Sequence, residues 1–170
     1  MTQLAHANYS PYNTEFNQQV TFGLSSSHSS NNDENIYKIY INSKISELES
    51  CLTKLNHIKN YQNNWDGYNA KQPGQLAINN TQNLLKRIFS LSYDASMNWS
   101  SPYISADSEG NIVLEWWGIN NKKITLYVGA KENYIEYLKS SNDKINEMED
   151  GEIQNFNLNC YVELFSWLNR

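Results

Sequence analysis

The chain has 170 residues, which suits one domain of ordinary size and is too short for two. Hydrophobic residues make up 39% of it and aromatic residues 13%, so this polar chain still carries enough large side chains for a core, and full disorder is excluded. The formal net charge of -5 argues against a duplex nucleic-acid partner, because neutralising phosphates requires clustered Lys and Arg.

The sequence also bears on the compartment of the protein. Neither a signal-peptide pattern nor a long apolar run is present, so we expect a cytoplasmic protein with no membrane partner. Cys51 and Cys160 lie far apart and lack metal-ligand spacing, which favours reduced structural thiols.

The first 34 residues combine a cluster of Ser and Asn with apolar side chains that follow no sustained period. Burial there cannot offset an ordering cost of roughly 1–2 kcal/mol per residue. The composition therefore predicts a flexible tail over residues 1–34 and a single domain over 35–170. The apolar residues between Tyr9 and Leu24 can dock on the body or on a partner.

A helix is predicted from about Ile36 to Asn60, with Asp33 or Asn35 as its N-cap. Its apolar residues recur with the spacing of one amphipathic stripe: Ile41, Ile45, Leu48, Leu52 and Leu55. The simplest interpretation packs this stripe on the domain core. The alternative is a short coiled-coil seam with a second copy, which makes residues 36–60 the candidate homo-oligomer interface.

A loop follows, with the sequence Asn-Trp-Asp-Gly-Tyr-Asn over residues 64–69. Asn, Asp and Gly tolerate turn conformations, whereas Trp and Tyr are large enough to anchor a loop by packing. The candidate motif-loop residues are Trp65, Asp66, Gly67 and Tyr68.

Pro73 suits the first turn of a second helix, which carries a stripe of Ala77, Thr81, Leu84 and Ile88. The two helices are therefore expected to form an antiparallel hairpin.

After Leu91 the apolar period changes from helical to alternating. Strands are predicted at 102–107, 111–117, 123–128 and 134–139, while 152–155 is ambiguous. A closing helix is predicted over 157–168, with a buried side made of Leu158, Tyr161, Leu164, Phe165 and Leu168. The expected fold class is α+β, with the helical hairpin and the C-terminal helix packed on one face of a roughly four-stranded antiparallel meander.

The alternation also predicts the strand register, because a slip of one residue would turn a whole apolar set toward solvent. Pairing Trp116 with Ile124, Leu114 with Leu126 and Ile112 with Val128 makes one face wholly apolar. The same register pairs Ile104 with Leu114 and Val128 with Ile135. The helices should cover this inner face.

The opposite face, here called the outer face, carries Tyr103, Val113, Glu115, Trp117, Lys123, Thr125, Tyr127 and Glu136. Aromatic residues beside paired charges are enriched at contact surfaces, and Lys123 opposite Trp117 permits a cation–π contact. The predicted partner-binding residues are Tyr103, Glu115, Trp117, Lys123 and Tyr127. The alternative is that the tail or the long loop covers these aromatic residues.

Asp66 and Glu115 are the two carboxylates that stand out from their surroundings. If they converge, they can hold a metal ion or divide acid and base roles, which makes a metal-dependent hydrolase the alternative function. The structural interpretation makes Asp66 an acceptor for loop amides and Glu115 a cross-strand partner of Thr125 or of the Tyr103 hydroxyl. No third ligand is evident, so no metal, cofactor or catalytic residue is predicted.

Two spaced motifs carry a resemblance to a known family. Asn64-Trp65-Asp66-Gly67-Tyr68-Asn69-Ala70 with Pro73, followed by the segment from Asp107 to Trp116, resembles a widespread group of small uncharacterised bacterial proteins. That group has an N-W-D-G-x-x-A-x-P loop between two helices and a later L-E-W strand, and Asn69 replaces a Gly common there.

The resemblance covers about residues 45–140 and implies that Trp65, Asp66, Gly67, Glu115 and Trp116 matter, for packing or for a site. It also implies an accessory role in a bacterial defence, toxin–antitoxin or mobile-element system. We therefore expect a non-enzymatic module that binds a protein partner with a basic surface.

Overall fold

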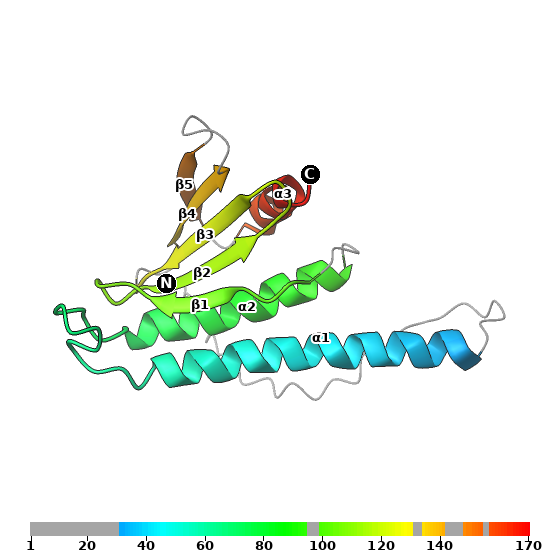
Figure 1. Ribbon diagram of the computed structural model, residues 1–170, viewed down its shortest axis with the longest axis horizontal. Coiled ribbons are helices and arrows are strands. Elements are labelled where there is room, and N and C mark those ends of the chain that lie inside the picture. Colours follow the sequence, from blue (N-terminus) through cyan, green and yellow to red (C-terminus); the bar gives the residue numbers. More distant parts are fainter. Residues whose placement is uncertain (1–30, 95–98, 131–133, 142–147, 155–156) are drawn as a thin grey trace, which may run out of the picture.

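The computed structural model describes residues 31–94, 99–130, 134–141, 148–154 and 157–170. Figure 1 shows that these residues form three helices and one antiparallel sheet with strand order β1-β2-β3-β4-β5. The helices are α1 (Asn31–Ile58), α2 (Gln75–Asp94) and α3 (Leu158–Leu168). The strands are β1 (Tyr103–Ala106), β2 (Ile112–Trp117), β3 (Lys122–Val128), β4 (Tyr134–Ser141) and β5 (Glu149–Gln154). The predicted α+β class is confirmed.

Helix α1 begins at Asn31, inside the segment predicted to be a tail, and the predicted caps Asp33 and Asn35 are already helical. The rest of the predicted tail, residues 1–30, lies outside the described residues.

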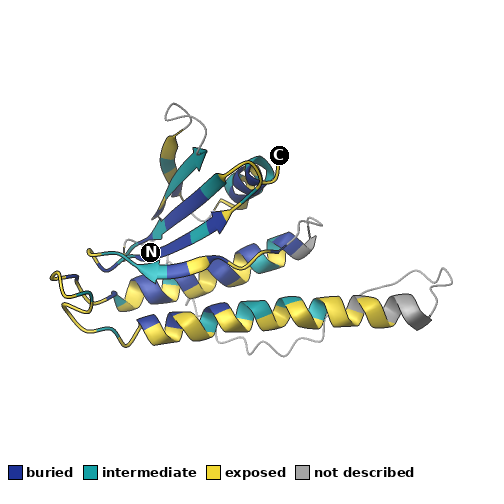
Figure 2. Ribbon diagram, in the orientation of Figure 1, coloured by how far each residue is buried: buried dark blue, intermediate teal, exposed yellow. Residues whose placement is uncertain are grey.

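The predicted stripe of α1 is confirmed only in its C-terminal half. Leu55 is buried there, with Cys51 and Ile58 beside it, and Leu48 and Leu52 pack partly against the core. Ile45 is instead 41% exposed. Figures 1 and 2 show that the N-terminal end of α1 extends past α2.

Helix α2 lies beside α1 and covers the inner face of the sheet together with α3 (Figure 1). Its predicted stripe is fully buried, from Ala77 through Thr81 and Leu84 to Ile88. The hydroxyl of Thr81 is satisfied within the helix, because it donates to the carbonyl of Ala77 at 2.7 Å. The helical hairpin is confirmed.

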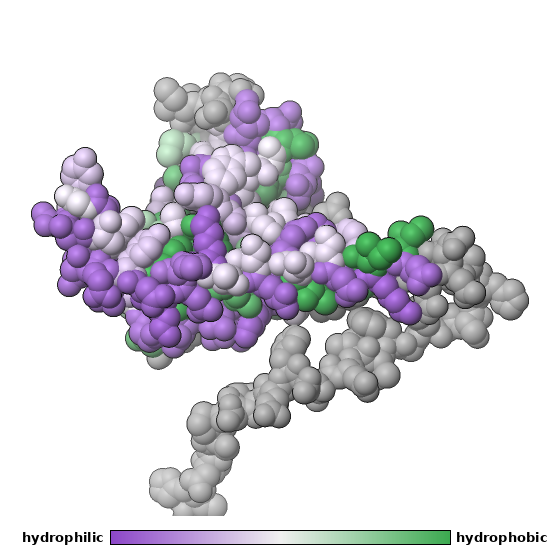
Figure 3. Space-filling view, turned by 60° about the horizontal axis from the view of Figure 1, so that its bottom comes forward, coloured by the Kyte–Doolittle hydropathy of each residue, from purple (hydrophilic) through white to green (hydrophobic). Residues whose placement is uncertain are grey.

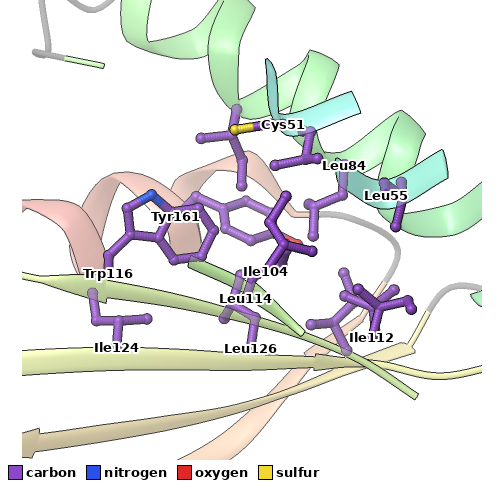
Figure 4. Close-up of a cluster of buried hydrophobic side chains, with 14 of the residues drawn as sticks. Cys51, Leu55, Leu84, Ile104, Ile112, Leu114, Trp116, Ile124, Leu126 and Tyr161 are labelled. Carbon is purple, nitrogen blue, oxygen red and sulfur yellow. The ribbon is translucent and has the colours of Figure 1, made fainter. Parts of the chain in front are cut away.

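The strand register agrees with the prediction at every pair that was named. Trp116 pairs with Ile124, Leu114 with Leu126 and Ile112 with Val128, while Ile104 pairs with Leu114 and Val128 with Ile135. Figure 4 shows the inner-face side chains meeting those of the helices, including Trp116, Leu114 and Tyr161. The apolar alternation was therefore sufficient to pair these residues correctly and to place them on the inner face.

Two expectations for the C-terminal part need correction. Residues 152–154 of the ambiguous segment 152–155 belong to a fifth strand, β5, which pairs with β4 through Ile153 and Ile135, whereas residue 155 lies outside the described residues. Leu158, predicted to be buried, is 39% exposed because it is the first residue of α3, next to the N-cap Asn157. The remaining predicted apolar residues of α3 are buried.

Among the helices that the structure describes, none combines the length and apolar character needed to cross a membrane.

Candidate functional site

Trp116 and Trp117 are adjacent on β2 and point to opposite faces of the sheet. The Trp116 side chain is 2% exposed, donates its indole N–H to the carbonyl of Ser100 at 2.9 Å and packs edge-on against Phe165 of α3. Trp117 is 60% exposed on the outer face. The prediction that the sheet presents a tryptophan on the side away from the helices is confirmed.

Tyr103 of β1 joins Trp117 on this face and is 51% exposed. The two rings meet edge to face with centroids 6.2 Å apart. Lys54, which comes from α1, holds its Nζ 4.0 Å from the centroid of the Tyr103 ring. Tyr103, Trp117 and Lys54 together are called the aromatic patch below.

The ammonium of Lys54 stabilises one position of the Tyr103 ring by a cation–π contact of about 0.5–1 kcal/mol at an exposed site. A ring held in place before binding loses less conformational entropy when a partner covers it. The sequence does not predict a role for Lys54, because it belongs to a helix and its spacing gives no signal of contact with a strand.

Lys123 and Glu115 form an ion pair beside the aromatic patch. Lys123 lies directly across from Trp117, as predicted, but its Nζ donates to Glu115 Oε1 at 2.8 Å. The same carboxylate oxygen accepts from the Thr125 hydroxyl at 3.4 Å. The cation that lies over an aromatic ring of the patch is therefore Lys54, whereas Lys123 neutralises Glu115.

The rest of the outer face is uneven in exposure. Thr125 and Val113 are buried under their longer neighbours, and Tyr127 is half-buried. The predicted partner-binding residues therefore share one face, but only Tyr103 and Trp117 offer large apolar area to a partner. Such a surface can bind and orient a macromolecule.

The motif loop connects α1 to α2 and is built around Asp66. Asp66 Oδ1 accepts from the backbone N–H of Tyr68 at 2.8 Å and from that of Ala70 at 3.1 Å. These bonds, that of Tyr68 first, lower the pKa of the Asp66 carboxyl below its ordinary value, because they stabilise its charged form. The structural interpretation of Asp66, a carboxylate that accepts from loop amides, describes what is observed.

Three residues of the loop have left-handed backbone conformations: Asn64 (φ 65), Gly67 (φ 79) and Asn69 (φ 69). Asn tolerates this region better than other residues with a Cβ, so Asn69 supplies the third left-handed position without a glycine. Trp65 anchors the loop by stacking on Tyr61, with centroids 4.9 Å apart, and by donating to the Lys71 carbonyl. Tyr68 stands at the tip and is 87% exposed.

The turn between β1 and β2 repeats the chemistry of the loop. Asp107 Oδ1 accepts from the backbone N–H of Glu109 and from that of Asn111, both at 2.9 Å. Asp66 and Asp107 thus each accept hydrogen bonds from the backbone N–H groups that lie two and four residues further along the chain. The sequence carries a signal for both turns, because each Asp is followed within three residues by a glycine. In the structure these glycines, Gly67 and Gly110, both have positive φ.

The two sequence motifs lie against each other. The N–H of Lys71 donates to the Ser108 carbonyl at 2.8 Å, and Lys71 also forms an ion pair with Glu109. The N–H of Gly74 donates to the Gly110 carbonyl at 3.2 Å. The loop and the turn are therefore one structural unit, called the double turn below.

Asp66 and Glu115 have separate sets of partners: loop amides for Asp66, and Lys123 with Thr125 for Glu115. Across the described residues, no group of three or more His, Cys, Asp and Glu side chains has the arrangement of a metal site. Burial raises the pKa of the Cys51 thiol, which keeps it protonated at neutral pH.

Comparison of the chain with protein-family models, with curated proteins and with solved structures finds no match.

Proposed function

We propose that this chain is a non-enzymatic module that binds a protein partner through the aromatic patch on its outer sheet face. The supporting observation is the exposure of Trp117 and Tyr103 on a regular strand pair whose other face is sealed by helices. Trp and Tyr are enriched among the residues that dominate binding energy, because they bury a large area at a small entropic cost.

The charge of the molecule favours a partner with a basic surface. The net charge is -5, and the same face carries Glu136 on β4 with Asp150 and Glu152 on β5. Complementary charge raises the association rate and selects against acidic partners. A toxin or a nucleic-acid-handling machine of a bacterial defence, toxin–antitoxin or mobile-element system has such a surface, which agrees with the motif resemblance.

The test uses the full chain as bait in the bacterial host, with captured proteins quantified by mass spectrometry. Trp117→Ala and Tyr103→Ala should each lower capture of the partner at least about tenfold, the effect of losing roughly 1.4 kcal/mol of binding energy. Leu76→Ala is the matched control, because Leu76 is a 48% exposed apolar residue on α2.

The captured protein, once purified, should bind the parent chain directly and more weakly as salt is raised. Capture that is the same for the parent, both aromatic variants and the control contradicts the proposal. So does the absence of any protein above background.

A further inference from the structure

The connection between α1 and α2, which carries the motif loop, is longer than a helical hairpin requires. It runs over residues 59–74, sixteen residues without a helix or strand, whereas neighbouring helices are commonly joined by about 2–8 residues. Figure 1 shows it projecting beyond the ends of both helices. Connections longer than about 12–15 residues that lack secondary structure are uncommon, and they are either disordered or functional.

Hydrogen bonds hold this connection in one conformation. In addition to the two bonds that Asp66 accepts, Asn64 Oδ1 accepts from the backbone N–H of Asn69 at 2.8 Å. Asn63 Oδ1 accepts from the backbone N–H of Gln72 at 2.9 Å. The polar side chains of the loop therefore hold its backbone, which is the arrangement of a functional loop on a rigid scaffold and not that of a spacer.

The tip of this ordered loop presents a tyrosine to solvent. Tyr68 is 87% exposed, the largest fraction among the exposed large hydrophobic side chains of the described residues. A Cβ added at Gly67 would have no atom within 4 Å, so the space around the tip is open. Folding gains little from a ring that stays in water. The ring is instead ready for a partner, because an ordered loop loses less conformational entropy on binding than a mobile one.

The composition of the loop favours recognition of a protein. Residues 60–69 consist of four Asn, two Tyr and one each of Gln, Trp, Asp and Gly. Antibody loops that bind proteins are enriched in Tyr, Gly and Asn with Trp at hot spots, because the rings supply rigid contact area and the amides supply adaptable hydrogen bonds. Figure 3 shows the end of the molecule that carries the loop as mostly hydrophilic. The loop therefore offers rings and amides for contact, and no aliphatic side chain.

The charged groups of this region have partners within the molecule. Asp66 accepts from two loop amides, and Lys71 pairs with Glu109 of the β1–β2 turn. Nucleic acid requires clustered Lys or Arg, and residues 60–70 contain neither. A small molecule requires a concave site, whereas this loop projects. The surface that fits the loop is an uncharged pocket on another protein, with apolar walls for the ring and an acceptor for the tyrosine hydroxyl.

We propose that the motif loop is a second protein-binding surface, which inserts Tyr68 into such a pocket. Trp117 ends β2, whereas the turn that precedes β2 contacts the loop through the bond from Lys71 to Ser108. The six residues of β2, about 20 Å, therefore separate the loop from the aromatic patch. Because the two surfaces also differ in charge, the loop takes a different partner, and the chain joins two proteins.

The first experiment identifies the partner of the loop. A photo-crosslinking analogue of phenylalanine is placed at position 68 of the full chain in the bacterial host, and irradiation should join the chain to one protein. The matched control carries the analogue at position 40, because Tyr40 is also an exposed tyrosine, at 46%, and lies on α1. That control should not give the same product. The crosslinked peptide of the partner, identified by mass spectrometry, should line an apolar pocket.

The second experiment measures binding of the purified partner to the full chain. Tyr68→Ala should raise the dissociation constant at least about tenfold, and Tyr68→Phe should raise it less, because the ring remains. Tyr40→Ala and Trp117→Ala should leave it unchanged, and circular dichroism verifies that each variant is folded. Raising NaCl from about 0.05 to 0.5 M should change the constant less than about twofold, because no unpaired charge takes part.

Four results overturn the inference. They are the absence of a product specific to position 68, binding that Tyr68→Ala leaves unchanged, binding that weakens about tenfold over that range of salt, and a crosslinked protein identical to the one whose capture Trp117→Ala abolishes. The loop does not depend on the aromatic patch for its contact. Loss of binding at Trp117 therefore leaves binding at Tyr68 measurable, so this inference and the proposed function fail separately.

Discussion

The two faces of the sheet use the same strands for different purposes. On the inner face, aliphatic residues and Trp116 lie against α2 and α3 with almost no exposure. On the outer face, Trp117 and Tyr103 remain open beside an ion pair. The difference shows that neighbouring residues of one strand can have separate roles: one stabilises the core, and the next remains exposed to a partner. Changes on the inner face should therefore unfold the protein, whereas changes on the outer face should leave it folded.

The largest effect is expected for Trp116→Ala. Removing this side chain leaves a cavity among Ile124, Phe165 and their neighbours, which costs about 3–5 kcal/mol in the free energy of unfolding. Trp117→Ala should cost less than about 1 kcal/mol, because its ring is mostly in water already. Urea titration followed by circular dichroism measures both, and similar losses for the two variants would show that the faces are not separated.

A smaller effect is expected for Gly110→Ala in the double turn. Gly110 has φ 84, and a Cβ there would come within 2.7 Å of the Gln72 carbonyl oxygen. Backbone strain and this overlap together should cost about 1–3 kcal/mol. Gly67→Ala provides the comparison, because Gly67 has φ 79 but open space around a Cβ. Gly67→Ala should lower the free energy of unfolding by about 1 kcal/mol. An equal loss for Gly67→Ala and Gly110→Ala would contradict the close packing of Gly110 against Gln72.

The third prediction concerns pH and the Asp66 turn. The pKa of Asp66 is lowered in the folded chain relative to about 3.9 in the unfolded chain, so its contribution is present above about pH 4. That contribution is lost as the pH falls through the folded pKa. Asp66→Asn should therefore melt at a lower temperature than the parent at neutral pH, with a gap that narrows below pH 4. If the difference in melting temperature between the two proteins does not change with pH, the negative charge of Asp66 does not stabilise the loop.

The smallest effect is expected for the contact between Lys54 and Tyr103. A double-mutant cycle with Lys54→Met and Tyr103→Leu should give a coupling of about 0.5–1 kcal/mol. In the binding assay, Lys54→Met should weaken capture less than Tyr103→Ala does, because it releases the ring without removing it. No coupling in the cycle would show that the ring is not held before binding.

The sheet register could be predicted from sequence because the inner-face residues from Ile104 to Ile135 alternate without interruption. β5 could not be predicted in the same way. Of its six residues only Ile153 is buried, so pairing with β4 depends on backbone hydrogen bonds that leave no apolar pattern. The sequence of an edge strand carries less information than that of a central strand for this reason.

The candidate site was predictable as a face and not as a set of contacts. The alternation of side chains along β2 and β3 predicted that Glu115, Trp117 and Lys123 share one face of the sheet, and the structure confirms it. Whether Lys123 would meet Trp117 or Glu115 depends on side-chain rotamers, and the arrival of Lys54 depends on where α1 lies. The exposed end of α1 was likewise unpredictable, because it reflects the length of its neighbour α2.

The double turn ties together two hairpins that are otherwise separate in the chain. Its amide bonds from Lys71 and Gly74 to the β1–β2 connection mean that the helical pair cannot swing away from the sheet without also releasing the first strand pair. Local opening in proteins occurs in contiguous cooperative units. Residues 58–94 and 99–117 should accordingly exchange their backbone hydrogens as a single block. An inserted residue in the motif loop or in the β1–β2 turn should destabilise the chain more than an insertion in a surface connection usually does.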